Sequence, residues 1–110
     1  MKKDTSVLLR HILDSIEAIE RYMSGITKEN FNILEEKQDS VIRRIEVIGE
    51  ATKSIPEDFK KENPTIPWKR MAGMRDVLIH QYDDVDIQVV WKTITEFIPP
   101  LKTQIQKLLN

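Results

Sequence analysis

GMRDVLIHQY, residues 73 to 82, is the stretch from which the rest of this chain is best interpreted. At about 100° per residue along a helix, Met71, Met74 and Leu78 fall on one apolar stripe. His80 lies roughly 180° from Met71 on the same projection. A histidine placed there faces water or a docked molecule rather than the core. The stretch therefore predicts a helix with one buried side and one side equipped for chemistry.

The composition indicates one compact helical domain. The chain has 110 residues, of which 40% are hydrophobic and 32% charged, with only three glycines. This length suffices for one sizeable core, so residues 1–110 are expected to form a single domain. The net charge of −1 argues against a broad electrostatic nucleic-acid binder but permits a local basic patch. The lack of cysteine removes disulfides and thiolate chemistry and is compatible with a reducing compartment.

The sequence carries no membrane or metal signature. No apolar run approaches the ~20 residues that a membrane span needs, and none follows the basic start as in a signal peptide. We therefore expect a soluble, cytoplasmic protein with no membrane partner. The two histidines, His11 and His80, are far apart and the carboxylates lack ligand spacing. We predict no metal site and assign no cofactor.

Apolar residues recurring every three to four positions predict an all-α protein. The architecture expected is an up-and-down bundle of four long helices plus one or two short ones. Short turns are expected after a cap at Thr27 and at Glu57–Glu62, and Pro99-Pro100 should kink the last helix without ending it. The long helices should run from Asp4 or Thr5 to about Met23, from Gln38 or Asp39 to Ile55, from Trp68 to about Gln81, and from a cap at Asp86 to Leu108.

Arg75 and His80 are the residues best suited to chemistry. An imidazole with an ordinary pKa of ~6.5 exchanges protons near neutrality, and a guanidinium binds phosphate oxygens. Together they supply the minimum for cleaving RNA without metal. Five residues correspond to ~140° around a straight helix, so the two side chains converge only if Arg75 curls round or if a twofold partner contributes. We prefer the second arrangement, because Ala72 and Gly73 leave room for close approach.

A plainer interpretation of the same residues is a surface of ordinary local contacts. Asp76 and His80 are spaced i, i+4 and could form a local pair, and an Arg-x4-His spacing is expected by chance in roughly one domain of this size in ten. Tyr82 at a helix end could be a packed ring with its hydroxyl in water. His11 is expected to be an ordinary surface residue.

The second long helix carries a charged stripe, Arg43, Glu46, Glu50 and Lys53. Such a stripe is usually a solvated face with weak ion pairs. Alternatively, Arg43 and Glu50 edge a cleft, where one holds phosphate and the other orients a catalytic side chain. Gly49 within the same turns costs helix stability and would be explained by a tight helix crossing.

Basic residues and tryptophans near the third long helix give further candidates. Lys69 and Arg70, with Arg43 and Arg44, are the best candidates for a local RNA phosphate patch. The tryptophans at 68 and 91 could stack on bases, but their places in apolar stripes favour core packing.

The segment Arg75–Tyr82, RDVLIHQY, resembles the R-x4-H-x-Y motif of the HepT-like toxins, a branch of the HEPN superfamily. Two further segments extend the resemblance. Ile45–Ala51 is similar to the family's Ile-Gly-Glu-Ala helix, and Ile66-Pro67-Trp68 followed by Gly73-Met74 is similar to its lead-in to the motif. The ordered set covers most of the chain, so the resemblance is specific.

The resemblance implies a homodimeric HEPN fold in which the motif helices line a cleft between subunits. It implies a metal-independent endoribonuclease toxin with Arg75 and His80 as the catalytic pair. It also implies an antitoxin partner, a minimal nucleotidyltransferase that transfers AMP to Tyr82. Asp76 stands where many relatives carry asparagine, and its charge is expected to weaken RNA affinity. The competing hypothesis is a non-catalytic dimer that binds the nucleotidyltransferase and is modified by it.

Overall fold

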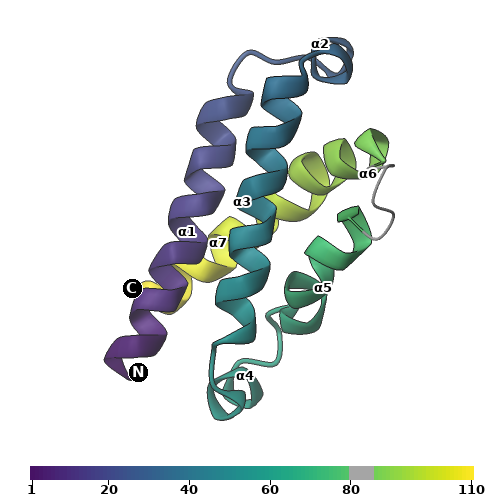
Figure 1. Cartoon of the computed structure of the whole chain (residues 1–110). Helices are drawn as coiled ribbons and strands as arrows, with labels where there is room; N and C mark the ends of the chain where they lie inside the picture. Colours follow the sequence, from purple (N-terminus) through teal and green to yellow (C-terminus); the bar gives the residue numbers. More distant parts are fainter. Residues whose placement is uncertain (80–85) are drawn as a thin grey trace.

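The computed structural model of the chain describes residues 1–79 and 86–110 (Figure 1). These residues are mostly helical and contain no strand, which confirms the all-α prediction. None of the described helices is long and apolar enough to cross a membrane. The helical segments are α1 (Lys3–Met23), α2 (Lys28–Ile33), α3 (Glu35–Lys53), α4 (Glu57–Glu62), α5 (Trp68–Ile79), α6 (Ile87–Lys92), η1 (Thr93–Phe97) and α7 (Ile98–Leu109).

The long helices form the expected up-and-down bundle. α1 and α3 lie side by side, with the short α2 joining them at one end (Figure 1). α5 packs against α3, and α4 leads into it at the opposite end of α3. α6, η1 and α7 follow one another without a break and count as the fourth long helix, which packs against α1. The helix that carries the motif therefore lies along one side of α3.

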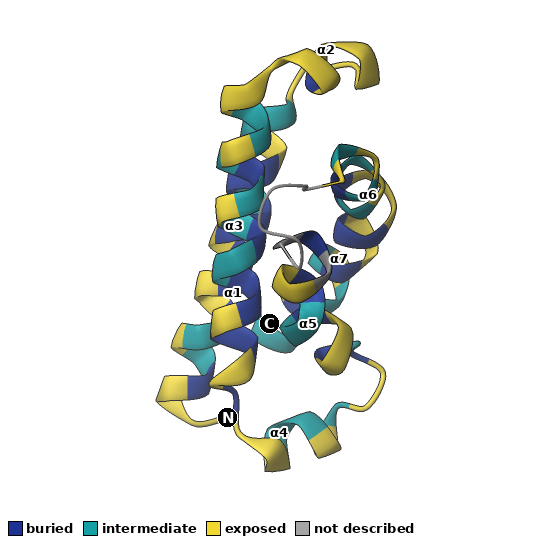
Figure 2. Cartoon of the chain, turned by 45° about the vertical axis from the view of Figure 1, so that its right-hand side comes forward, coloured by how far each residue is buried: buried dark blue, intermediate teal, exposed yellow. Residues whose placement is uncertain are grey.

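The core is one cluster to which every long helix contributes an apolar stripe. Buried residues face inward along α1 and α3, and exposed ones cover the outer faces (Figure 2). The stripe predicted for α5 is confirmed, because Met71, Met74 and Leu78 are all at most 4% exposed. The largest fully buried side chains are Leu9, Ile12, Ile16, Phe31, Val41, Ile45, Ile48, Met71, Val90, Leu101 and Ile105.

The predicted caps at Thr27 and Asp86 are confirmed, whereas the predicted starts of the first and second long helices are wrong. Thr27 and Asp86 accept hydrogen bonds from backbone N–H groups of the first turns of α2 and α6. α1, however, begins at Lys3 and has no side-chain cap. Asp4 lies in its first turn, where a carboxylate favours the helix dipole, and Thr5 is buried at 2% exposure and so does not cap.

α3 also starts earlier than predicted, at Glu35 instead of 38 or 39. Two acidic residues, Glu35 and Glu36, stand in its first turn and interact favourably with the helix dipole. The helix ends at Lys53, two residues before the predicted Ile55, and Pro56, which disfavours a helical residue before it, lies three residues after that end. The apolar stripe alone did not reveal this polar first turn.

Pro99 and Pro100 leave the last helix continuous, as predicted, but its irregular part lies before them. A π-helical segment, η1, spans Thr93–Phe97, and the Ile98 N–H donates to the Thr93 carbonyl five residues back. Two prolines cannot donate to the carbonyls four residues earlier, and their rings crowd those carbonyls. A wider turn relieves this crowding before the regular helix resumes.

Candidate functional site

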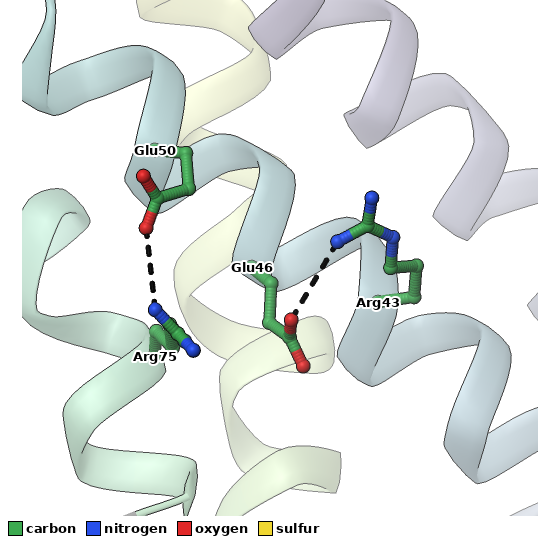
Figure 3. A network of polar contacts seen from close by, with 4 residues as sticks. All are labelled: Arg43, Glu46, Glu50 and Arg75. Atoms are coloured by element: carbon green, nitrogen blue, oxygen red, sulfur yellow. Dashed lines mark hydrogen bonds and ion pairs between the residues drawn. The ribbon is translucent and has the colours of Figure 1, made fainter.

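Arg75 lies on the flank of α5 that faces α3. Its neighbours on the apolar stripe are buried, whereas 47% of its own side chain is exposed. Its Nη1 donates to Oε1 of Glu50 on α3 at 3.4 Å (Figure 3). The Glu50 side chain is itself 59% exposed. The structure thus brings together two of the predicted site residues, 25 positions apart in sequence, on an exposed surface between two helices.

The close approach of α3 and α5 makes this contact possible. Gly49 is buried at the crossing, and a Cβ placed on it would lie 3.5 Å from the carbonyl oxygens of Met71 and Ala72. That distance is an ordinary van der Waals contact. α3 and α5 therefore cross at Gly49, but the space there would also accept a methyl group, so the crossing does not by itself explain the glycine.

A second ion pair lies one turn away along α3. Arg43 Nη1 and Glu46 Oε2 are 3.6 Å apart, and the Arg43 side chain is largely exposed. Figure 3 shows Glu46 and Glu50 on the same side of α3, each pointing toward its own guanidinium. This face presents two arginines and two glutamates to solvent, so it carries balanced charge and no strong field.

Asp76 is exposed beside Arg75, and Gly73 lies one turn before it. Among the described residues, nothing would touch a Cβ on Gly73 within 4 Å. The outer face of α5 is therefore open at the position where we expected a second copy to approach. His80 and Tyr82 lie outside the described residues, so their predicted roles stay predictions.

The basic candidates at the start of α5 lie away from Arg75. The Arg70 guanidinium carbon is 4.0 Å from the centroid of the Phe97 ring in η1, a cation–π contact. Lys69 and Arg70 line a groove together with Lys60 and Lys61 of α4. Arg43 and Arg44 belong to α3 and do not line this groove.

Sequence reasoning missed the parts played by Phe97 and by the α4 lysines. Phe97 belongs to an apolar stripe and gave no sign that it would support a cation. The lysines follow Phe59, which is close in space to Trp68, and this aromatic pair was the available signal that α4 folds back onto the start of α5.

Both tryptophans serve the core, as their stripes predicted. Trp68 is 7% exposed, and its Nε1 donates to the Asn63 carbonyl at 2.9 Å. The Trp91 ring lies 5.7 Å from the Phe31 ring, centroid to centroid. Within residues 1–79 and 86–110, no three histidine, aspartate or glutamate side chains are grouped as metal ligands would be.

Comparison with known proteins places these features in a family. Residues 12–108 match the family described as "Ribonuclease HepT-like". A Thermococcus cleftensis protein named "Probable ribonuclease HepT" is 48% identical over 108 residues, which cover 98% of each chain. A Caldanaerobacter subterraneus protein named "Putative RNase" is 39% identical over 102 residues, covering 93% of this chain and 91% of that one.

A longer relative carries the same region as half of its length. The Methanocaldococcus jannaschii protein named "Gamma-glutamylcyclotransferase and putative RNase" is 46% identical over all 110 residues, and the chain spans 50% of it. The search of solved structures found no match. The family match over most of the chain, together with the motif segments, establishes that this protein belongs to the HepT-like family of the HEPN superfamily.

Proposed function

We propose that this protein is a metal-independent endoribonuclease and the toxin of a toxin–antitoxin pair. The observation that carries the proposal is an intact R-x4-H-x-Y motif, Arg75 to Tyr82, in a chain of the HepT-like family. The relatives named as ribonucleases support the same activity. The exposed position of Arg75 on α5 is compatible with access to an RNA backbone.

In the proposed mechanism, the 2′-hydroxyl of the substrate attacks the adjacent phosphorus and the 5′ oxygen leaves. The His80 imidazole takes the 2′-hydroxyl proton or protonates the leaving oxygen, roles that histidine side chains commonly play in general acid–base catalysis. The Arg75 guanidinium stabilises the charge that builds on the phosphorane oxygens. Glu50, hydrogen-bonded to Arg75, is a positioning residue that fixes the direction of the guanidinium.

The site is completed by a second copy of the chain. Arg75 and His80 are ~140° apart on a straight helix, so a twofold partner brings the missing group of each pair into one cleft. The open face at Gly73 is where the partner helix approaches. Arg43 borders this cleft, and Asp76 lowers the affinity for RNA by adding negative charge beside Arg75.

A nucleotidyltransferase antitoxin controls the enzyme by transferring AMP to Tyr82. The modification adds bulk and a negative phosphodiester near the mouth of the site, which blocks and repels RNA. An intact mass taken after incubation with the transferase and ATP should therefore increase by one or more AMP units. The Tyr82→Phe variant should keep its unmodified mass.

Purified protein tests the nuclease directly. The wild type should cleave an RNA transcript in the presence of EDTA, whereas His80→Ala and Arg75→Ala should lose at least ~100-fold in rate, the usual contribution of general acid–base or charge-stabilising groups. Equal cleavage by wild type and both variants would show that a contaminant cuts the RNA. Absence of cleavage by the unmodified wild type would contradict the proposal.

A second candidate is a non-catalytic dimer that binds the transferase. It is favoured by the net charge of −1 and by the balanced charges on the Arg43–Arg75 face. Under this alternative, His80→Ala should co-purify with the transferase like the wild type, and the wild type without AMP should cut no RNA.

A further inference from the structure

The groove between α4 and the start of α5 is a strongly basic surface hollow. It has a volume of about 850 Å³ and is lined by Lys60, Lys61, Lys69 and Arg70, with Glu57 as the only carboxylate. The lining residues thus carry a net charge of +3 on a chain whose overall charge is −1. Positive charge gathered in a hollow raises the local concentration of anions.

The walls of this groove are fixed by contacts between α4 and α5. The Phe59 and Trp68 rings meet edge to face with centroids 6.1 Å apart. The Trp68 indole N–H donates to the Asn63 carbonyl, and the Asn63 amide donates to the Phe59 carbonyl at 3.0 Å. The two lysines of α4 are therefore held beside Lys69 and Arg70 of α5 before any ligand arrives, so binding requires little ordering of the backbone.

The four cations of the groove differ in whether they already have a partner within the protein. Lys60 is 14% exposed and lies 3.5 Å from Glu57. Lys61 and Lys69 are exposed and, within the described residues, have no carboxylate partner at ion-pair distance. Arg70 is held over Phe97, a contact that orients its planar fork without neutralising it. Two exposed lysines and one oriented guanidinium are thus available to an anion.

The chemistry of the groove suits a phosphodiester backbone better than a base. Trp68 borders it but is buried, and its N–H is already used. The groove therefore offers cations for phosphates and no exposed aromatic platform on which a base could stack. Cations without base-reading groups bind nucleic acid by its backbone, regardless of sequence.

Within this groove, Arg70 lies on the opposite flank of α5 from Arg75. Five residues separate Arg70 from Arg75, which is ~7.5 Å along the axis and ~140° around it.

We propose that this groove is a second, sequence-independent RNA-binding site that holds the phosphate backbone of single-stranded RNA away from the point of cleavage. The proposal rests on the proposed ribonuclease function, because it assigns the groove to the same substrate. Lys61 and Lys69 bind phosphates directly, and Arg70 anchors the strand where α5 meets η1.

Binding measured in a cleavage-deficient background tests this site. In His80→Ala protein, Lys61→Gln/Lys69→Gln should weaken binding of a fluorescent single-stranded RNA at least about fivefold, and the slope of log K against log salt should fall by ~1.4, or ~0.7 per lost phosphate contact. The lysines are preferred to Arg70, whose stack on Phe97 also supports the fold. Oligonucleotides of different sequence should give the same loss.

The matched control is Lys28→Gln/Lys107→Gln, which removes the same charge from exposed positions outside the groove. It should change affinity less than about twofold, since its lysines contact no bound phosphate. Equal losses of RNA affinity in the two double variants, or no loss in either, would contradict the proposal that the groove binds RNA. Unchanged RNA binding with weakened capture of a purified nucleotidyltransferase would assign the surface to a protein partner and also overturn it.

The two proposals fail in different ways. Wild-type protein that cleaves RNA, combined with unchanged binding by the Lys61/Lys69 variant, rejects the groove and keeps the nuclease. Groove-dependent RNA binding by protein that never cleaves rejects the nuclease and keeps the groove as an RNA-binding surface.

Discussion

Arg75 is the described residue that bears most directly on chemistry. Its contact with Glu50 orients the guanidinium but adds little to the stability of the fold. Both side chains are about half exposed, and their 3.4 Å separation is long for a charge-assisted hydrogen bond. Exposed pairs of this kind contribute ~1 kcal/mol or less. The pair should therefore matter for where the guanidinium points and hardly for whether the chain folds.

Glu50→Gln separates these two effects. The amide keeps an acceptor oxygen but loses the charge that directs Arg75. We expect the rate of RNA cleavage to fall about tenfold, while the free energy of unfolding changes by less than ~1 kcal/mol. Glu46→Gln, which removes the neighbouring carboxylate paired with Arg43, is the control and should cleave at the wild-type rate. Equal rates in all three proteins would show that Glu50 does not position Arg75.

For single residues, the sequence predicted the face of the helix on which a side chain lies but not the side chain on another helix that it contacts. The helical period placed Arg75 on the flank of the buried stripe, and the structure has it there. The sequence offered Glu50 as a residue that could orient a catalytic side chain, but it could not show that Glu50 meets Arg75, because that depends on how far α3 slides along α5. Arg70 illustrates the same gap, because its partner Phe97 is supplied by the last helix and looked like ordinary core.

Among the helices, the crossing of α3 and α5 sets the geometry of the site. Gly49 lets the backbones approach closely, yet a methyl group there would make ordinary contacts at 3.5 Å. Gly25 is different, because its φ of +74° lies in the left-handed region just after α1. The surroundings of Gly49 thus permit a larger residue, whereas Gly25 is needed for its backbone conformation.

Alanine substitutions should separate the two glycines. Gly49→Ala should raise the free energy of unfolding by up to ~1 kcal/mol, because a mid-helix glycine is the poorer helix former and the space permits the methyl. Gly25→Ala should lower it by ~1–2 kcal/mol, because an L side chain is strained at positive φ. Urea unfolding followed by circular dichroism measures both. A destabilising Gly49→Ala would mean that the crossing is tighter than 3.5 Å contacts imply.

The sequence predicted the course of the helices better than their ends. Apolar stripes located the buried faces, and Asp86 marked the start of the last helix. The start of α1 was missed because Asp4 and Thr5 look like caps, although the core takes up Thr5. The π turn of η1 was missed because a proline pair reveals local crowding but not which turn relieves it.

For the molecule as a whole, one short ion pair joins the first helix to the last. Lys102 Nζ of α7 lies 2.7 Å from Glu20 Oε1 of α1. Its hydrogen bond to Glu20, reinforced by the nearby charges of Glu20 and Glu17, raises the pKa of Lys102 above the ordinary lysine value against an opposing effect of desolvation. A raised folded-state pKa contributes stability that is complete below the unfolded pKa and is lost as pH rises through the folded one.

The Lys102→Gln variant should therefore have a lower free energy of unfolding than the wild type near neutral pH. This difference should shrink at alkaline pH. We expect the gap in free energy of unfolding to be constant from about pH 7 to 9 and to narrow above the ordinary lysine pKa of ~10.4. Lys107→Gln, at an exposed position on the same helix, should show no such narrowing. A gap independent of pH up to 11 would mean that lost packing, not the ion pair, causes the difference.

The proposed enzyme also depends on an assembly of two copies. The wheel angle between Arg75 and His80 and the open face at Gly73 both favour a site shared across a twofold axis. In such a site, the arginine of one subunit works with the histidine of the other. A site built within one subunit would instead need both groups intact in the same chain.

Mixing two inactive variants distinguishes these arrangements most directly. Arg75→Ala and His80→Ala subunits are unfolded together, refolded as a mixture, and assayed for RNA cleavage in EDTA. Random pairing gives half mixed dimers with one complete site of two, so a shared site predicts recovery of about a quarter of wild-type activity. Activity in the refolded mixture no higher than in either variant alone would contradict a nuclease site shared between subunits.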